Sequence, residues 1–314
     1  MAEIVLIHGI AQEQEGKASL EYRWIPALAD GVRAAGHDGL ADTIWPAGRP
    51  GSPDIQMAYY GDLFKRKGAQ GGEDRLTDLP QEEQDLAASL AAEWLTHAAE
   101  RDNPDQKTAK RQLAHLDPTH PPQGPKEEAT RAIINGVAKL KWFAPTGMAF
   151  AERFVNKSLK QVTRYLSEPE LYEKIQQRVL DLIGPDTKAI IGHSLGSVIA
   201  YEIAASHLKA PLPLLLTIGS PLGLQTIIYD RIKPQPPEYP NLVRKWVSIA
   251  DRNDLVAAKP DLTTLFDRNK PAEGVLESAW TVDNGAKPHQ GEYYLRKAQT
   301  GKPIAAALDD AATR

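Results

Sequence analysis

Short runs of aliphatic residues alternate with segments whose apolar residues have a helical spacing. The four aliphatic residues at 4–7 predict a strand buried on both faces. Apolar residues then recur at every fourth position, at Leu20, Trp24, Leu28 and Val32. This spacing predicts a helix over 19–35, which Gly36 ends. Residues 41–45 and 55–60 are expected to form a second strand, interrupted by a loop rich in Gly and Pro. This order is that of the opening of a βαβ unit.

The pattern changes between residues 62 and 167, where continuous apolar runs disappear. Three stripes with helical spacing replace them: Leu86, Leu90 and Trp94; Ile133, Val137 and Leu140; and Val155, Leu159, Val162 and Leu166. The polar stretch 101–130 contains five prolines and is expected to be loop or poorly ordered. We therefore expect a helical insertion or cap at 62–167, with a separate domain as the alternative.

The alternation of strands and helices resumes after the insertion. Helices are expected over 171–182 and 197–208 and from 304 onward, and strands over 188–191, 212–218, 243–250 and 279–283. Strands that alternate with helices predict a mostly parallel, doubly wound sheet covered on both faces. The expected fold class is α/β, with residues 1–61 and 168–314 as its core.

Composition narrows the class of protein. With 42% hydrophobic and 25% charged residues, the 314-residue chain is expected to be globular. Its net charge of −4 gives no reason to expect nucleic acid as a partner. The absence of cysteine excludes disulfides, a cysteine nucleophile and thiolate metal sites. No stretch has the form of a signal peptide or a transmembrane segment, so we expect a cytoplasmic protein.

One pentapeptide carries the chemistry of the chain. Gly192-His193-Ser194-Leu195-Gly196 follows an aliphatic strand and precedes a helix, which is the context of a G-x-S-x-G nucleophile elbow. The turn is tight, so glycines two residues before and after the serine avoid clashes. The helix that follows offers free N–H groups where negative charge develops. Ser194 is therefore the predicted nucleophile, and a tight turn without chemistry is the alternative.

Several segments in chain order resemble the lipase- and esterase-like branch of the α/β-hydrolase superfamily. The resemblance covers 1–60 and 185–300, and not the insertion. The matching segments are His8-Gly9-Ile10, the elbow at 192–197, the GSP-type turn at 217–223, the acid-bearing segment at 246–256, and the strand and histidine loop at 282–295. It implies an α/β-hydrolase fold, and a nucleophile, acid and histidine in that order along the chain.

A serine hydroxyl needs an adjacent base, and the base needs a carboxylate that fixes its tautomer. After Ser194 there are two histidines, and His289 lies in a loop where the resemblance places the base, whereas His207 is expected on a helix pointing away. Asp254 has the family's form for the acid, because it precedes Leu255-Val256. Asp251 is expected to brace the turn. Asp230 and Asp261 are weaker candidates.

The other histidines are expected to have supporting positions. His193 is expected to pack in the elbow and to face away from the site, and His8 to shape the oxyanion loop. Surface positions are expected for His97, His115 and His120. The oxyanion hole itself is expected to consist of two backbone N–H groups, one from Leu195 and, by resemblance, one from Ile10.

These residues predict an enzyme that cleaves a carboxylic ester through an acyl-enzyme on Ser194, with a small-molecule or lipid-like substrate. Thioesterase or amidase activity with the same residues stays open, as does a binding or signalling module on a hydrolase fold. No metal or organic cofactor is expected. The aromatic stretch 140–150 is expected to be a core contact of the insertion, an apolar rim or lid, or a patch for a partner or membrane surface.

Overall fold

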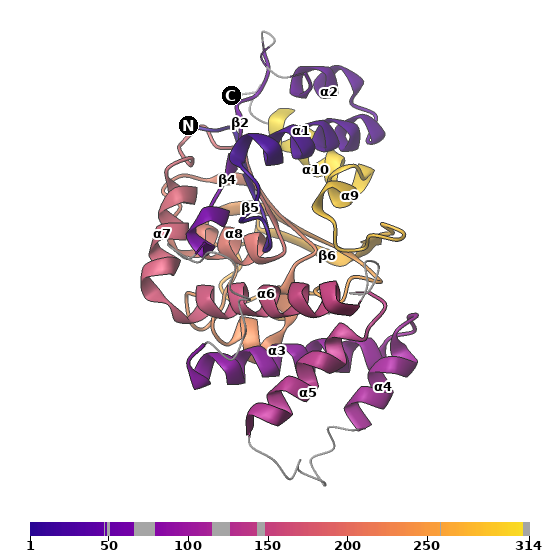
Figure 1. Cartoon of the computed structure of the whole chain (residues 1–314). Helices are drawn as coiled ribbons and strands as arrows, with labels where there is room; N and C mark the ends of the chain where they lie inside the picture. The colour runs from indigo at the N-terminus through magenta and orange to yellow at the C-terminus, as the bar shows by residue number, and fades with distance from the viewer. Residues whose placement is uncertain are drawn as a thin grey trace. The chain divides into compact units, whose positions relative to one another are not determined.

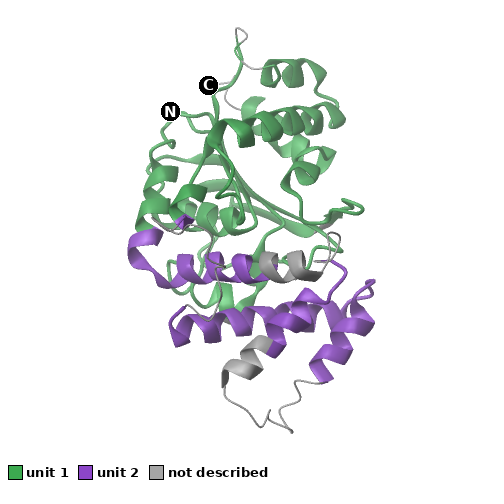
Figure 2. Ribbon diagram, in the orientation of Figure 1, with its two compact units in different colours: residues 1–63, 173–314 green, residues 64–172 purple. Residues whose placement is uncertain are grey.

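A computed structural model describes residues 1–46, 48, 51–65, 79–114, 126–142, 148–257 and 259–309. By internal contacts the chain divides into unit 1, Met1–Leu63 with Glu173–Arg314, and unit 2, Phe64–Tyr172 (Figure 2). None of the described helices is long and apolar enough to cross a membrane.

Unit 1 is an α/β structure built on a parallel sheet (Figure 1). In the described residues the sheet has six strands in the order β2-β1-β3-β4-β5-β6, and every neighbouring pair is parallel. The strands are β1 (Ile4–Ile7), β2 (Ile55–Ala58), β3 (Ala189–His193), β4 (Leu212–Ile218), β5 (Val243–Asp251) and β6 (Val275–Val282). The expectation of a mostly parallel α/β sheet is confirmed.

Both faces of this sheet are covered, as the aliphatic strands predict. All four residues of β1 are buried. Ile4 and Leu6 share one core with α1 (Lys17–Ala34), α2 (Asp38–Ile44) and α10 (Ala298–Asp309), to which Trp24 and Leu308 also belong. Because side chains alternate along a strand, Val5 and Ile7 face the other side, where α8 (Leu195–Ser206) packs on β1, β3 and β4. A short helix, α9 (Gly291–Leu295), contacts α1.

The second strand is shorter than expected, because residues 41–45 are not part of it. Residues 38–44 form α2, and β2 begins only at Ile55. Ala41 and Ile44, three residues apart, are both buried in the core shared with α1, a spacing that suits one face of a helix. Asp38 lies in the first turn, where its negative charge interacts favourably with the helix dipole and stabilises α2. Packing against α1 thus overrides the strand propensity of Thr43 and Ile44.

Unit 2 consists of helices, as the three stripes predict. It contains α3 (Gln81–Glu100), α4 (Gln106–Ala114), α5 (Lys126–Ala138) and α6 (Met148–Ser167), and α7 (Pro169–Leu180) begins in unit 2 and continues in unit 1. The stripe residues are buried, except for Ile133 and Leu166, which are half-buried. Asp105 accepts hydrogen bonds from the N–H groups of Lys141 (2.6 Å) and Trp142 (3.0 Å), and so fixes the chain after α5.

The expectation of a loop throughout 101–130 is wrong. α4 occupies residues 106–114, and α5 begins at Lys126. The prolines of this stretch lie outside these helices, and α4 itself consists of good helix formers such as Gln, Lys, Ala and Arg. Ala109 is the buried residue of α4, which packs on α3. The mostly polar composition of this thirty-residue stretch does not reveal a helix whose apolar face is narrow.

Candidate active site

The carboxyl ends of the parallel strands bring separate loops to one edge of the sheet. The chain leaves β1 for β2 on one side, and later returns to β3 on the other side of β1. Such a switch in strand order leaves a crevice outside the carboxyl ends, where α/β proteins bind ligands. His8 follows β1 and Ser194 follows β3 at this edge of the sheet, and the segments after β4, β5 and β6 reach the same edge.

Ser194 lies in the turn between β3 and α8 with an unusual backbone conformation, φ 53° and ψ −126°. Holding a residue other than glycine there costs on the order of 1–3 kcal/mol. A Cβ atom on Gly192 would lie 2.3 Å from the carbonyl oxygen of Gly196, and one on Gly196 would lie 2.3 Å from that of Ile7. Both positions therefore require glycine, and the tightness of the turn is what holds Ser194 at the end of the strand.

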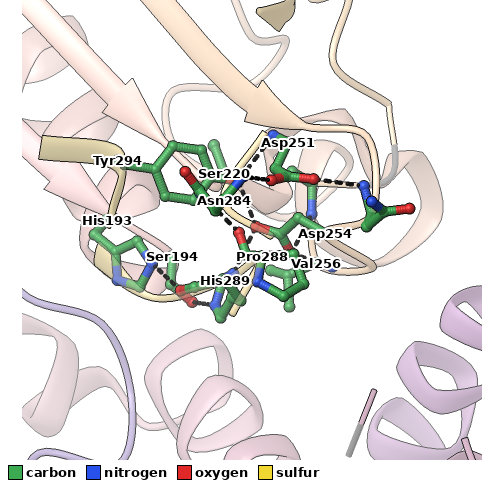
Figure 3. A network of polar contacts seen from close by, with 12 residues as sticks. His193, Ser194, Ser220, Asp251, Asp254, Val256, Asn284, Pro288, His289 and Tyr294 are labelled. Carbon is green, nitrogen blue, oxygen red and sulfur yellow. Dashed lines mark hydrogen bonds and ion pairs between the residues drawn. The ribbon is translucent and has the colours of Figure 1, made fainter. Parts of the chain in front are cut away.

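His289 links the two residues that the sequence pairs with it (Figure 3). Its Nε2 atom lies 3.0 Å from Oγ of Ser194, and its Nδ1 atom lies 2.8 Å from Oδ2 of Asp254. A carboxylate can only accept, so Nδ1 carries the proton and Nε2 is left to accept from the Ser194 hydroxyl. The structure thus brings Ser194, His289 and Asp254 together in one chain of hydrogen bonds.

Asp254 is fully buried, and its carboxylate is surrounded by donors. Oδ1 accepts from the N–H groups of Val256 (2.9 Å) and Ala257 (3.4 Å), and Oδ2 accepts from the hydroxyl of Tyr294 (2.8 Å) as well as from His289. Burial by itself raises the pKa of Asp254, but the charge and hydrogen bond of His289 and the hydrogen bond of Tyr294 outweigh it and lower the pKa. Asp254 is therefore ionised.

The other acid candidates do not contact His289. Asp251 ends β5 and accepts hydrogen bonds from the N–H groups of Asn253 (2.7 Å) and Asn284, so it braces the turn as expected. Burial raises its pKa, and these two hydrogen bonds oppose the rise. Asp261 binds the neighbouring Thr263, and Asp230 follows the π-helical segment Gln225–Tyr229. Asp254 is the carboxylate that meets the histidine.

Gly219, at the end of β4, makes room for this contact. Its φ of +54° is in the left-handed region that favours glycine. A Cβ atom there would lie 2.9 Å from Oδ2 of Asp254 and 3.3 Å from Nδ1 of His289, the two atoms that share a hydrogen bond. The turn after β4 therefore packs directly against the Asp254–His289 pair.

The loop after β1 lies against the elbow. A Cβ atom on Gly9 would lie 2.8 Å from Cβ of Ser194, so a side chain at this position is excluded. Ala11 has a φ of 61°, which is strained for a residue other than glycine. In the described part of the chain, no hydrogen bond uses the backbone N–H of Ile10 or of Leu195, the first residue of α8. These are the two groups that the sequence proposes as donors.

His8 fixes this loop through both nitrogens of its ring. Nε2 accepts from the N–H of Tyr60 (3.1 Å), so the ring proton is on Nδ1, which donates to the carbonyl of Gly9 (2.7 Å). The ring stacks on Tyr60 with centroids 4.0 Å apart, and the hydroxyl of Tyr60 donates to the carbonyl of His8. Burial lowers the pKa of His8 to about 4, so the ring is neutral.

The expectation that His193 faces away from the site is wrong. His193 ends β3 and is buried, and its Nε2 atom lies 2.8 Å from the carbonyl oxygen of His289. The two imidazole rings are 4.7 Å apart. In a continuous strand, neighbouring side chains point to opposite faces, so His193 would point away from Ser194. The sharp turn at Ser194 breaks this alternation. Sequence spacing alone does not show that reversal.

The predictions for the other histidines have different outcomes. His97 is buried on α3, so the prediction of a surface position is wrong; its neighbours on the helix, Glu93 and Glu100, each lie 3.7 Å from one of its ring nitrogens. His207 is exposed at the end of α8, as expected. His115 and His120 lie outside the described residues.

Tyr294 is the functional neighbour that sequence reasoning missed. Its hydroxyl accepts from the N–H of Asp251 (2.9 Å) and donates to Asp254, and the side chain is fully buried. The sequence shows two adjacent tyrosines shortly after His289, but no pattern distinguishes Tyr294 from half-buried Tyr293. Of the aromatic stretch 140–150, residues 143–147 lie outside the described residues, so the interpretations of that stretch stay predictions.

Comparisons with protein families, curated proteins and solved structures found no match to this chain. Among the described residues, no group of three or more His, Cys, Asp or Glu side chains is arranged to hold a metal ion.

Proposed function

We propose that this protein is a serine hydrolase of the α/β-hydrolase superfamily, which cleaves a carboxylic ester through an acyl-enzyme on Ser194. The observation that carries the proposal is the position of His289, 3.0 Å from the Ser194 hydroxyl and 2.8 Å from the buried Asp254 carboxylate. A serine, a histidine and an ionised aspartate in this order make a weak alcohol nucleophilic at neutral pH.

In the proposed first half of the reaction, Oγ of Ser194 attacks the ester carbonyl while Nε2 of His289 takes the hydroxyl proton. The carbonyl oxygen becomes an oxyanion, which the N–H groups of Leu195 and Ile10 would stabilise; one such donor contributes about 3–4 kcal/mol. When the tetrahedral intermediate collapses, the proton on His289 passes to the leaving alcohol. An acyl ester of Ser194 remains.

In the second half, water attacks the acyl-enzyme and gives a proton to His289. The proton returns to Ser194 as the carboxylic acid leaves. Asp254 stays ionised throughout: it holds His289 in the tautomer with the proton on Nδ1, and it stabilises the imidazolium that forms twice per cycle. Its four hydrogen bonds keep the carboxylate in place while the charge beside it changes.

The decisive experiment is labelling with a fluorophosphonate probe, which reacts with an activated serine. We expect the wild-type protein to label, Ser194→Ala not to label, and Ser19→Ala to label at the wild-type rate, because Ser19 is exposed on α1. A folded wild-type protein that does not label, or a Ser194→Ala variant that does, would overturn the proposal and favour a binding module.

The bond that is cleaved is tested with an ester, a thioester and an amide of the same acyl group. We propose the ester as the preferred substrate. All three use the same steps, so a higher kcat/KM for the thioester or the amide would reassign the substrate class and leave Ser194 as the nucleophile.

A further inference from the structure

His193, the residue before Ser194, contacts His289 in two ways. Its Nε2 atom lies 2.8 Å from the main-chain carbonyl oxygen of His289, and its ring lies against the ring of His289, with centroids 4.7 Å apart and planes at 39°. One contact holds the backbone of His289 and the other restricts its side chain. No other described residue makes both contacts with His289.

The hydrogen bond defines the protonation state of His193. A carbonyl oxygen only accepts, so Nε2 carries a proton and donates it. Burial, followed by the nearby His289, lowers the pKa of His193 to about 3, so the ring is neutral and Nδ1 has no proton. With its Nε2–H given to a carbonyl, His193 is not the base that activates Ser194. It acts on His289 instead.

The packing around His193 joins the loops of the site. A Cβ atom on Gly9 would lie 3.2 Å from Nδ1 of His193, and one on Gly291 would lie 3.4 Å from the same atom and 2.9 Å from the ring of Trp24. The edge-on ring of Trp24 is 6.0 Å away. The imidazole of His193 thus lies between the loop after β1, helix α1 and the start of α9.

His289 needs this support because its own segment is irregular. Residues 283–290 form neither strand nor helix. The carbonyl of Pro288 accepts from Nδ2 of Asn284 (3.1 Å), and the next carbonyl, that of His289, accepts from His193. The His193 contact adds a hydrogen bond at His289 itself to those of the flanking turn, such as the one from the N–H of Gln290 to the carbonyl of Lys287 (3.1 Å).

We propose that His193 is a positioning residue, which holds His289 by its carbonyl and its ring face so that Nε2 of His289 stays in line with Ser194. This inference rests on the proposed function. It predicts that loss of the His193 hydrogen bond lowers kcat and leaves KM unchanged, because substrate binding does not require the base to be aligned. A misplacement of about 1 Å lowers the rate about 100-fold.

The test compares two amide substitutions that differ in where they place a donor. The amide nitrogen of Gln reaches the place of Nε2, whereas that of Asn reaches only the place of Nδ1. We expect His193→Asn to lower kcat for a nitrophenyl ester about 10- to 100-fold at constant KM, and His193→Gln to retain most of the activity. His207→Gln, at an exposed histidine, is the control and should keep the wild-type kcat.

A second readout does not depend on turnover. The proton shared by Nδ1 of His289 and Asp254 should give a low-field proton NMR signal in the resting protein. We expect this signal in the wild type and in His193→Gln, and we expect it broadened by exchange in His193→Asn. If the wild type does not react with fluorophosphonate, the proposed function fails, but the NMR comparison still tests the role of His193.

A third variant keeps His193 and crowds the ring of Trp24, which packs edge-on against it. Gly291→Ala adds a methyl group 2.9 Å from the Trp24 ring and at an ordinary contact distance of 3.4 Å from His193, so Trp24 must shift. We expect the shift to loosen the His193 ring, with a lower kcat and the same broadening. Thermal unfolding of each variant shows whether it is folded. The proposal is overturned if folded His193→Asn retains the wild-type kcat and signal, or if His193→Gln loses as much as His193→Asn.

Discussion

The hydroxyl of Tyr294 donates a 2.8 Å hydrogen bond to Oδ2 of Asp254, the same oxygen that accepts the Nδ1–H of His289. Tyr294 also accepts from the N–H of Asp251, so a single side chain of α9 connects the acid to the end of β5. The residue that aligns the carboxylate therefore comes from the segment that also carries the histidine. The short segment from His289 to Tyr294 thus holds both the base and the hydroxyl that positions the acid, Asp254.

Removal of this hydroxyl should impair the alignment of Asp254. We expect Tyr294→Phe to lower kcat for ester hydrolysis about 10-fold, because a hydrogen bond to a charged group contributes about 1.5–3 kcal/mol. Tyr293→Phe is the matched control, since Tyr293 is half-buried and contacts Lys287 and Arg296 through its ring, which Phe retains. Equal kcat values for the two variants would contradict the role of the Tyr294 hydroxyl.

The choice between the two aspartates is tested by replacing each with Asn. Asp254→Asn should lower kcat on the order of 10⁴-fold, because the amide no longer holds His289 in the reactive tautomer. Asp251→Asn should reduce the free energy of unfolding by about 1–3 kcal/mol, because one buried N–H loses its carboxylate partner. Urea unfolding and steady-state kinetics separate the two effects. A larger kcat loss in Asp251→Asn would reassign the acid.

Gly219 allows a test of steric contact separately from backbone strain. Gly219→Ala places a methyl group 2.9 Å from Oδ2 of Asp254, and Gly285→Ala places one at a similar φ of +62° with nothing within 4 Å. Both substitutions should cost roughly 1–2 kcal/mol of stability from strain. Only Gly219→Ala should also lower the rate of fluorophosphonate labelling. Equal labelling rates in both variants would show that the contact does not matter.

The buried neutral histidines should make stability depend on pH. The pKa values of His8 and His193 fall from 6.5 to about 4 and about 3, so between these values and 6.5 the unfolded chain binds more protons than the folded one. The free energy of unfolding should therefore be highest above a pH of about 6.5. Below it, each histidine should lower the free energy of unfolding by up to about 1.4 kcal/mol per pH unit.

Urea unfolding between a pH of about 7 and about 5 checks this dependence. His193→Gln should reduce the slope of unfolding free energy against pH by up to about 1.4 kcal/mol per pH unit. His207→Gln should leave the slope unchanged, because His207 is exposed. The titratable groups around the two histidines are present in all three proteins: Asp62 near His8, and Asp254, His289 and His8 near His193. Identical slopes would mean that His193 is not buried as a neutral ring.

Local sequence determined the parts of this protein that obey a simple period or a local steric rule. The four consecutive aliphatic residues at 4–7 place apolar side chains on both faces of a strand, so both faces are expected to be buried, and all four residues of β1 are. Gly192 and Gly196 are set by contacts of the elbow with itself and with the adjacent strand, and their spacing about Ser194 is visible in the sequence. The stripes of α3 and α6 follow the period of a helix, so their buried residues were predictable.

Only the tertiary structure decided the features that depend on contacts between segments distant in the sequence. Residues 41–44 are helical because Ala41 and Ile44 meet the core shared with α1, and the strand propensity of the segment does not encode that partner. His193 points toward the site because the backbone reverses at Ser194, and Tyr294 reaches Asp254 across 40 residues of sequence. A single sequence records which groups a chain carries, but distances between loops follow from the packing of the sheet and its helices, which no local period expresses.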